Sequence, residues 1–291
     1  MQVAIHSGAA FTDEGGLLKS LQENGQTLRD HGVALYGPRR YRQAIRAPLQ
    51  ALEAGATPAA SIESLRKAFP DGPGLHRTIL SSPDFLGEIS SAIRDGQFYP
   101  SAGQRIAFLD QAFSGHQLEL FLGLRNPGSF IPKVLAALPE EERQEILKTT
   151  DLSCLSWLSV IEDIRDLAPQ VSITVWANED TPLIWGDIIR NLSALPEETP
   201  LKAEFDLLSS LVSPAGQREI RAIAEQDPPR DPATLKDRLA AVFEAHAVHE
   251  EIEEELDLPG WSDDIIDAFT VLYSQDLARL RSMPDVRVLG R

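Results

Sequence analysis

The chain has 291 residues, of which 43% are hydrophobic, and its formal net charge is −17. A charge this negative argues against binding to nucleic acid or to anionic membrane surfaces, because both would repel the protein. The sequence has no run of about 18 apolar residues and does not begin with a basic region followed by an apolar stretch. We therefore expect a cytoplasmic protein without a transmembrane helix or signal peptide. The single cysteine, Cys154, excludes an internal disulfide, and nothing indicates the oligomeric state.

Strand patterns and helix patterns alternate along most of the chain. Short β-rich segments stand at residues 2–6, 77–81, 118–124 and 171–177, with a weaker one at 286–289. Helical patterns lie between them near residues 15–31, 40–53, 58–69, 101–113, 130–138, 153–167 and 182–194. This alternation predicts βαβ units and a parallel sheet, and the nearly continuous apolar runs indicate strands that are covered on both faces.

The chain after residue 200 is almost entirely helical in pattern. Helices are expected near residues 233–256 and 262–282, before the weak strand. We predict an α/β fold with a helical C-terminal region, in a single domain over residues 1–291. Within it, residues 1–195 form a βαβ core and residues 196–291 form a mostly helical extension that ends in a short strand.

Polar loops follow four of the predicted strands. Ligands of an open parallel sheet bind outside the carboxyl ends of its strands, which selects the loops 6–14, 81–85, 125–133 and 177–181. Their polar residues include His6, Ser7, Thr12, Ser82, Asp84, Arg125, Lys133 and Glu179. Polar residues follow strands in every α/β protein, so this placement alone does not establish a site.

The first loop has the frame of an anion site but not its charge. Small residues lead from an apolar strand into a helix, whose N-terminus favours anions. Where a phosphate loop carries a lysine and a glycine, this chain has Phe11, Asp13 and Glu14. A carboxylate about 4 Å from a phosphate costs about 1 kcal/mol in water and more at lower dielectric. The two acids suit the helix instead, Asp13 as its N-cap and Glu14 as a first-turn acid.

Four segments, taken in this order, resemble the P-loop sulfotransferases, in particular the bacterial carbohydrate-sulfotransferase-like kind. The segments read IHSGAAFTDEGGLL, TILSSPDF, LFLGLRNPGSF and TVWANEDTPLIWGDII. The resemblance covers roughly residues 1–195 and implies a three-layer, P-loop-like parallel sheet. It also implies a reaction, the transfer of a sulfuryl group from 3′-phosphoadenosine 5′-phosphosulfate to a hydroxyl of a sugar or small metabolite.

The resemblance assigns the donor nucleotide to two of the loops. Ser7, Gly8 and Thr12 would hold the 5′-phosphosulfate, and Arg125 would grip the 3′-phosphate. Lys133 stands where the family has a serine, and a lysine can also hold a phosphate. An alternative is that Arg125 caps a strand end or pairs with an acid of the fourth loop.

Sulfuryl transfer needs a base for the acceptor hydroxyl and cations for the donor charge. The candidate bases are His6 and Asp84, although His6 could equally be a structural histidine and Asp84 a helix cap. The substrate-binding candidates are Arg39, Arg42, Ser82 and Glu179. The two arginines flank another arginine in YGPRRYR and could face the same way in an extended segment, where they would replace the missing lysine. Their alternative is a solvated surface.

The degenerate phosphosulfate loop leaves a second interpretation open. The chain could be a catalytically inactive relative that binds a small phospho-ligand or a protein partner. In either case we expect a small anionic or nucleotide ligand. A nucleotide-hydrolysing switch is disfavoured, because no Gly-Lys-Ser/Thr is present. We expect no metal site, since the spacing of His246, His249 and Glu250 lacks a further ligand.

Overall fold

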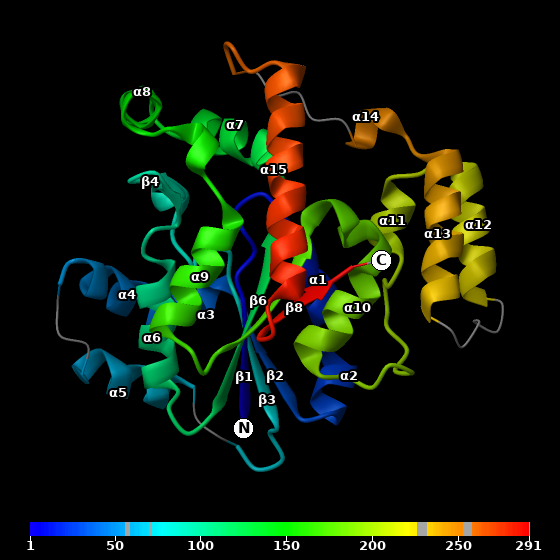
Figure 1. Cartoon of the computed structure of the whole chain (residues 1–291). Helices are drawn as coiled ribbons and strands as arrows, with labels where there is room; N and C mark the ends of the chain where they lie inside the picture. The colour runs from blue at the N-terminus through cyan, green and yellow to red at the C-terminus, as the bar shows by residue number, and fades with distance from the viewer. Residues whose placement is uncertain (56–58, 70–71, 226–231, 253–257, 291) are drawn as a thin grey trace.

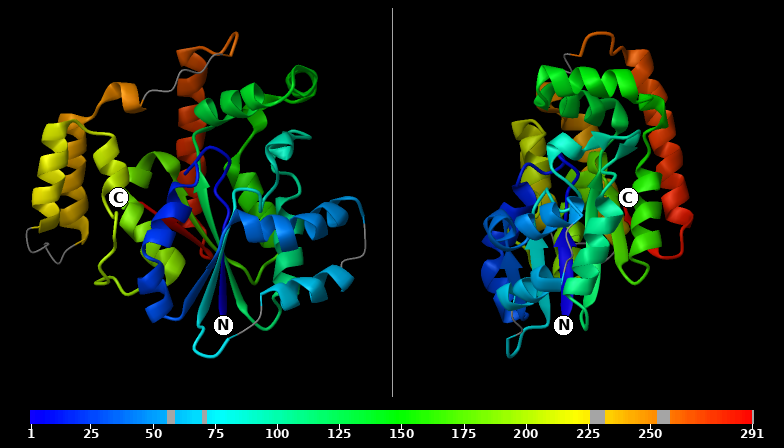
Figure 2. Two further views of the ribbon diagram at one scale, coloured as in Figure 1. Left: turned by 180° about the vertical axis from the view of Figure 1, so that it is seen from behind. Right: turned by 90° about the vertical axis from the view of Figure 1, so that its left-hand side faces the viewer.

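A six-stranded parallel sheet forms the centre of this computed structural model, which describes residues 1–55, 59–69, 72–225, 232–252 and 258–290. The strands lie in the order β2-β3-β1-β6-β7-β8, and every neighbouring pair is parallel. Helices cover both faces (Figures 1 and 2). The predicted α/β fold with a three-layer, P-loop-like parallel sheet is therefore confirmed.

The sequence patterns locate five of the six central strands to within one residue. These are β1 (Gln2–His6), β3 (Arg77–Ser81), β6 (Gln117–Leu124), β7 (Ser172–Ala177) and β8 (Val286–Leu289). The sixth, β2 (Val33–Tyr36), was not predicted, and it pairs with β3 at the edge of the sheet. A small antiparallel hairpin of β4 (Ile93–Arg94) and β5 (Gln97–Phe98) was also missed.

The helices divide between the two faces of the sheet. One face packs against α1 (Gly16–Glu23), α2 (Gly25–Asp30) and α10 (Thr181–Ser193). The other packs against α3 (Pro38–Ala44), α4 (Arg46–Glu53), α5 (Ala59–Ala68), α6 (Ala102–Ala112), α7 (Pro127–Ala137), α9 (Trp157–Leu167) and α15 (Asp263–Ser282). The expected helices at 15–31 and 40–53 are each broken into two, at Asn24 and at Ile45.

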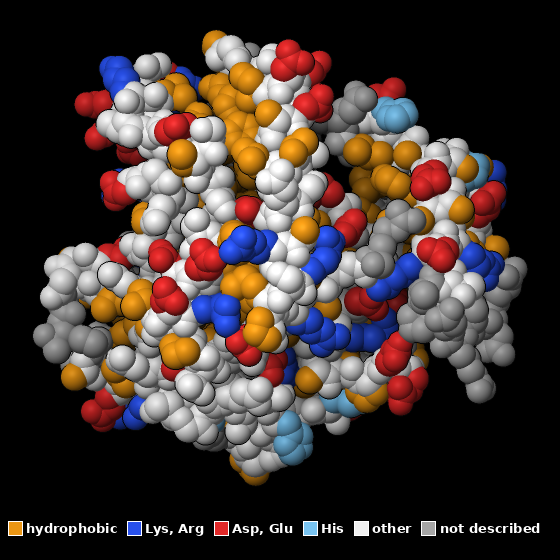
Figure 3. All heavy atoms as spheres, in the orientation of Figure 1, with side chains coloured by type: hydrophobic (Ala, Val, Ile, Leu, Met, Phe, Trp, Pro, Cys, Tyr) orange, Lys and Arg blue, Asp and Glu red, His pale blue; other side chains and the backbone are white. Residues whose placement is uncertain are grey.

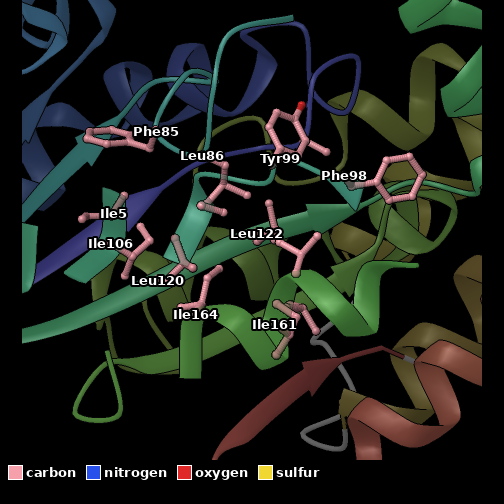
Figure 4. Packing of buried hydrophobic residues seen from close by; sticks show 14 of the residues in the cluster. Ile5, Phe85, Leu86, Phe98, Tyr99, Ile106, Leu120, Leu122, Ile161 and Ile164 are labelled. Atoms are coloured by element: carbon pink, nitrogen blue, oxygen red, sulfur yellow. The ribbon is translucent and has the colours of Figure 1, made fainter. Parts of the chain in front are cut away.

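The strands alternate their side chains between the two faces. On β6, Leu120 and Leu122 enter the larger core, whereas Phe121 enters the core beneath α1 and α10. Figure 4 shows Leu120 and Leu122 beside Ile5 of β1 and Ile161 of α9. Because the side chains of a strand point alternately to opposite faces, this register sets which residues reach each layer.

The helical extension leaves the sheet after α10 and returns to it in β8. It consists of α11 (Asp206–Ser210), α12 (Pro214–Glu225), α13 (Pro232–His246), α14 (His249–Ile252) and α15. The expected helix at 233–256 corresponds to α13 and α14, and its end falls outside the described residues. Helix α15 packs against α7, and hydrophobic side chains gather on the surface between them (Figure 3). Helix α8 (Glu140–Thr149) follows α7.

Candidate functional site

The four predicted loops lie together at the carboxyl edge of the sheet, as the strand pairing requires. His6, the last residue of β1, is in register with Ser81 at the end of β3, and β6 continues on the other side of β1 into Arg125. Leu124 at the end of β6 is level with Ala177 at the end of β7. The candidate residues therefore share one edge, and α7 and α15 lie over it (Figure 1).

His6 is buried in the wall of this edge. Its ring is only 3% exposed, its Nδ1 lies 2.9 Å from Ser81 Oγ, and it stacks at 6.3 Å on Trp176. Burial lowers the pKa of His6, and the nearby Asp13 carboxylate opposes that shift. Nε2 is also buried and has no hydrogen-bond partner among the described residues. His6 is therefore neutral near pH 7, and its polar atoms face protein rather than solvent.

The carboxylate of Asp13 lies at the start of α1. Its carboxylate Oδ2 accepts a hydrogen bond from the Leu17 backbone N–H at 3.1 Å, and its carbonyl accepts from Gly16 N–H at 2.6 Å. The N-cap residue is Gly15, so the prediction of Asp13 at that position is wrong. The helix begins later than expected, yet the carboxylate still supplies the negative charge that the helix start favours.

The rest of the loop is held by hydrogen bonds within the protein. Ser7 Oγ accepts from the Leu86 N–H at 3.3 Å, and the Thr12 hydroxyl donates to the Ala9 carbonyl at 2.8 Å. A Cβ on Gly8 would lie 2.5 Å from Thr12 Oγ1, so the turn needs glycine for close approach. Two of the hydroxyls predicted to bind the donor are thus engaged with the backbone.

Two cations converge on the loop from the third predicted segment. Arg125 is buried, and its guanidinium donates to the Phe11 carbonyl and to Ser129 Oγ, the latter at 3.1 Å. Lys133 Nζ lies 5.9 Å from the centre of the Phe11 ring, within the range of a cation–π contact. Phe11 adopts a left-handed backbone, with φ 62°, which a bulky residue reaches only at a cost. Phe11, which stands in place of the expected lysine, therefore contacts both Arg125 and Lys133.

Asp84 lies at the neighbouring loop, beside a cluster of charged groups. It is half-buried, and burial raises the pKa of its carboxyl, with a further rise from Glu88. Arg105, Arg46 and Arg42 oppose that rise. The predicted base and one of its predicted partner cations, Arg42, are thus close enough to influence each other.

Arg39 and Arg42 do not lie in an extended segment. They belong to α3, and both side chains are exposed. The physical reason is Pro38 at the first helical position, where its fixed φ starts a helix. Residues three apart on a helix remain neighbours, so the two arginines still share a face.

The other two predicted substrate-binding residues, Ser82 and Glu179, form hydrogen bonds with neighbouring residues of the protein. Ser82 is 1% exposed, and its Oγ accepts from the Asp84 N–H at 3.5 Å. The Glu179 carboxylate accepts from the Asn126 N–H at 2.9 Å and from the Tyr273 hydroxyl at 3.1 Å. Glu179 therefore joins the loop after β6 to α15.

Two residues that the sequence does not mark, Tyr99 and Arg105, support these loops. The Tyr99 hydroxyl accepts from the Ala10 N–H at 3.0 Å, and Figure 4 shows Tyr99 at the end of the hairpin among the buried side chains. Arg105 is 2% exposed and donates to the Asp84 carbonyl and to the Tyr41 hydroxyl, both at 2.8 Å. No local pattern marks these residues, because each acts across a long stretch of sequence.

The described residues contain no group of three His, Cys, Asp or Glu side chains that could hold a metal ion. Among the helices that the structure describes, none is long and apolar enough to cross a membrane.

Comparisons with known proteins identify no family for this chain. No family model matches the chain, and no curated protein does. One similar chain comes from the structural characterisation of the PezAT chromosomal toxin–antitoxin system of the human pathogen Streptococcus pneumoniae. The match covers 77% of this chain and 88% of that chain, at 11% sequence identity and a TM-score of 0.26. A likeness this weak carries no argument about fold or function.

Proposed function

We propose that this chain is a P-loop-like protein that binds a small phosphorylated ligand and does not transfer a sulfuryl group. The observation that carries the proposal is the position of Asp13, whose carboxylate accepts from the Leu17 N–H at 3.1 Å. A phosphosulfate at the helix start would compete with this carboxylate for the same donors. The loop has also replaced the lysine that would neutralise the leaving oxygen by Phe11.

Arg125 and Lys133 support retention of an anionic ligand. Both reach the loop at Phe11, and both come from the segment that the resemblance connects with the 3′-phosphate. An arginine and a lysine at one loop suit a phosphate, because the guanidinium binds two oxygens and the ammonium adds a point charge. The ligand expected there is a small phosphorylated compound such as a nucleotide.

Calorimetry with 3′,5′-adenosine bisphosphate tests this proposal directly. We expect binding in the micromolar range, no detectable binding by Arg125→Ala, and weaker binding by Lys133→Ala. Arg165→Ala is the matched control, because Arg165 pairs with Asp285 at 2.7 Å, away from the loop. Melting curves of each variant verify folding. The absence of binding at millimolar nucleotide would refute the proposal.

A second candidate is sulfuryl transfer itself, and Asp84 is the observation that favours it. A carboxyl with a raised pKa beside Arg42 could take the proton of an acceptor hydroxyl while the arginine neutralises charge on the donor. Incubation with 3′-phosphoadenosine 5′-phosphosulfate and a panel of sugar hydroxyl acceptors separates the candidates. A sulfated product that the wild type forms and the Asp84→Asn variant does not would establish a sulfotransferase. It would overturn the proposal that the protein binds a ligand without transferring a sulfuryl group.

A further inference from the structure

A groove of about 860 Å³ lies between α10 and the helical extension. Its walls come from α10, the segment that leads into α11, and helices α12 and α13. These elements lie together on the right of Figure 1. Clefts of roughly 300 to 1,000 Å³ between packed units are typical small-molecule sites. The volume therefore fits a ligand rather than a single water or ion.

The inner surface of the groove is largely apolar. Leu183, Phe205 and Leu235 line it and pack against the small core of the extension. Ile223 lies in that core and is 6% exposed. Trp185 also lines the groove, and its indole N–H donates to Ser20 at 3.1 Å. Walls from four separate segments, fixed by their own core, make the groove preformed.

Two of the basic residues that line the groove, Arg190 and Lys236, already form ion pairs with carboxylates. Arg190 Nη1 lies 2.6 Å from Glu204 Oε1, and Lys236 Nζ lies 2.6 Å from Asp187 Oδ2. All four side chains are at most about one third exposed, so these pairs are shielded from solvent. An anionic ligand that used either of these two bases would have to displace its carboxylate.

The charged lining residues that form no ion pair within the described part of the chain are mostly acidic, and they lie on the exposed side of the groove, which we call its mouth. Glu197, Glu198 and Asp206 line the groove and are exposed. Among the described lining residues, Arg221 is the one base outside an ion pair, and its Nε donates to the Gln217 carbonyl at 3.3 Å. Figure 3 shows acidic and basic side chains interspersed on this side of the molecule. The unpaired charge of the lining therefore favours a cation.

We propose that this groove binds a small organic cation with an apolar body, of the alkylammonium or arylammonium class. The apolar part would lie against Phe205 and Leu235, and the ammonium would face Glu197, Glu198 and Asp206 at the mouth. None of the lining residues belongs to the four loops at the sheet edge, and the proposal does not depend on the function proposed for those loops.

The test compares n-octylammonium, octanol and octanoate by calorimetry at low salt. These probes share one chain length and differ only in head-group charge. We expect octylammonium to bind at least about tenfold more tightly than octanoate, with octanol between them. Raising the salt concentration should weaken octylammonium binding, because the acids at the mouth are exposed to screening.

Two matched substitutions on α12 locate the site. Ala224 lines the groove and is exposed, so Ala224→Trp would fill the space at little cost to the fold. Ala222 is exposed on the same helix and is not part of the lining, so Ala222→Trp is the control. We expect octylammonium binding to be lost in the first variant and kept in the second.

A triple variant tests the role of charge without altering the core. Glu197→Gln, Glu198→Gln and Asp206→Asn together should reduce octylammonium affinity to that of octanol. Three results would each overturn the proposal. They are octanoate binding as tightly as octylammonium, unchanged binding in Ala224→Trp, and no binding of octylammonium at millimolar concentration.

Discussion

Substitution of Asp13 by asparagine separates the two roles that its carboxylate plays. The amide oxygen can still accept from the Leu17 N–H, so the hydrogen bond at 3.1 Å is retained while the charge is lost. A ligand phosphate held near this loop by Arg125 and Lys133, about 4 Å from the carboxylate, would be repelled by about 1 kcal/mol in water and by about 4 kcal/mol at an effective dielectric of 20. Because Asp13 is half-exposed, we take about 1–2 kcal/mol, which corresponds to roughly 5- to 30-fold tighter binding of adenosine bisphosphate.

The same substitution should lower stability. Loss of a negative charge that lies against the start of a helix costs about 0.3–1 kcal/mol, measurable by urea unfolding. Glu14→Gln is the control, because Glu14 is the exposed neighbour of Asp13 and its substitution removes one negative charge from the same loop. It should change affinity by less than Asp13→Asn does. If Asp13→Asn folds normally and binds no more tightly than the wild type, the carboxylate does not occupy the anion position and the reasoning fails.

Three further predictions concern the same edge of the sheet. Burial lowers the pKa of His6 below 6.5. As the pH falls, His6 is therefore protonated in the unfolded chain before it is protonated in the folded protein. The free energy of unfolding should decrease below pH 6.5, by up to about 1.4 kcal/mol per pH unit. Urea unfolding across pH should show a flatter profile for His6→Asn. Tyr99→Phe leaves the buried Ala10 N–H without its acceptor and should cost about 1–3 kcal/mol, with faster amide exchange at Ala10; unchanged exchange would contradict the contact. Gly8→Ala should cost about 1–3 kcal/mol through its clash with Thr12 Oγ1, and adding Thr12→Ala should recover part of that loss in a double-mutant cycle.

The central strands could be predicted from the sequence because they are buried and strongly apolar. Every residue of β3 is buried, and β1 is buried over four of its five residues. By contrast, β2 has four residues with one buried, and α8 has no buried residue, so neither presents a hydrophobic period. Helix breaks at Asn24 and Ile45 interrupt patterns that remain apolar across the break.

The position of the four loops at one edge could be predicted, but the contacts among their residues could not. Strand order and direction place the four loops at one edge, so a rule about parallel sheets was sufficient to find them. The contact of Arg125 with the Phe11 carbonyl joins residues far apart in the chain, as does that of Tyr99 with Ala10. Such contacts depend on side-chain packing at the edge, which local sequence patterns do not encode.

The return of the chain to the sheet in β8 has a consequence during synthesis. Strand β7 pairs with β6 on one side and with β8 on the other, but β8 begins at Val286, long after β7 ends at Ala177. At about 5–20 residues per second, a ribosome needs roughly 5 to 20 s to make the intervening segment. During this interval the backbone of β7 presents an unpaired edge, which is a template for association with other chains. The nascent protein therefore depends on β8 to cover that edge of β7.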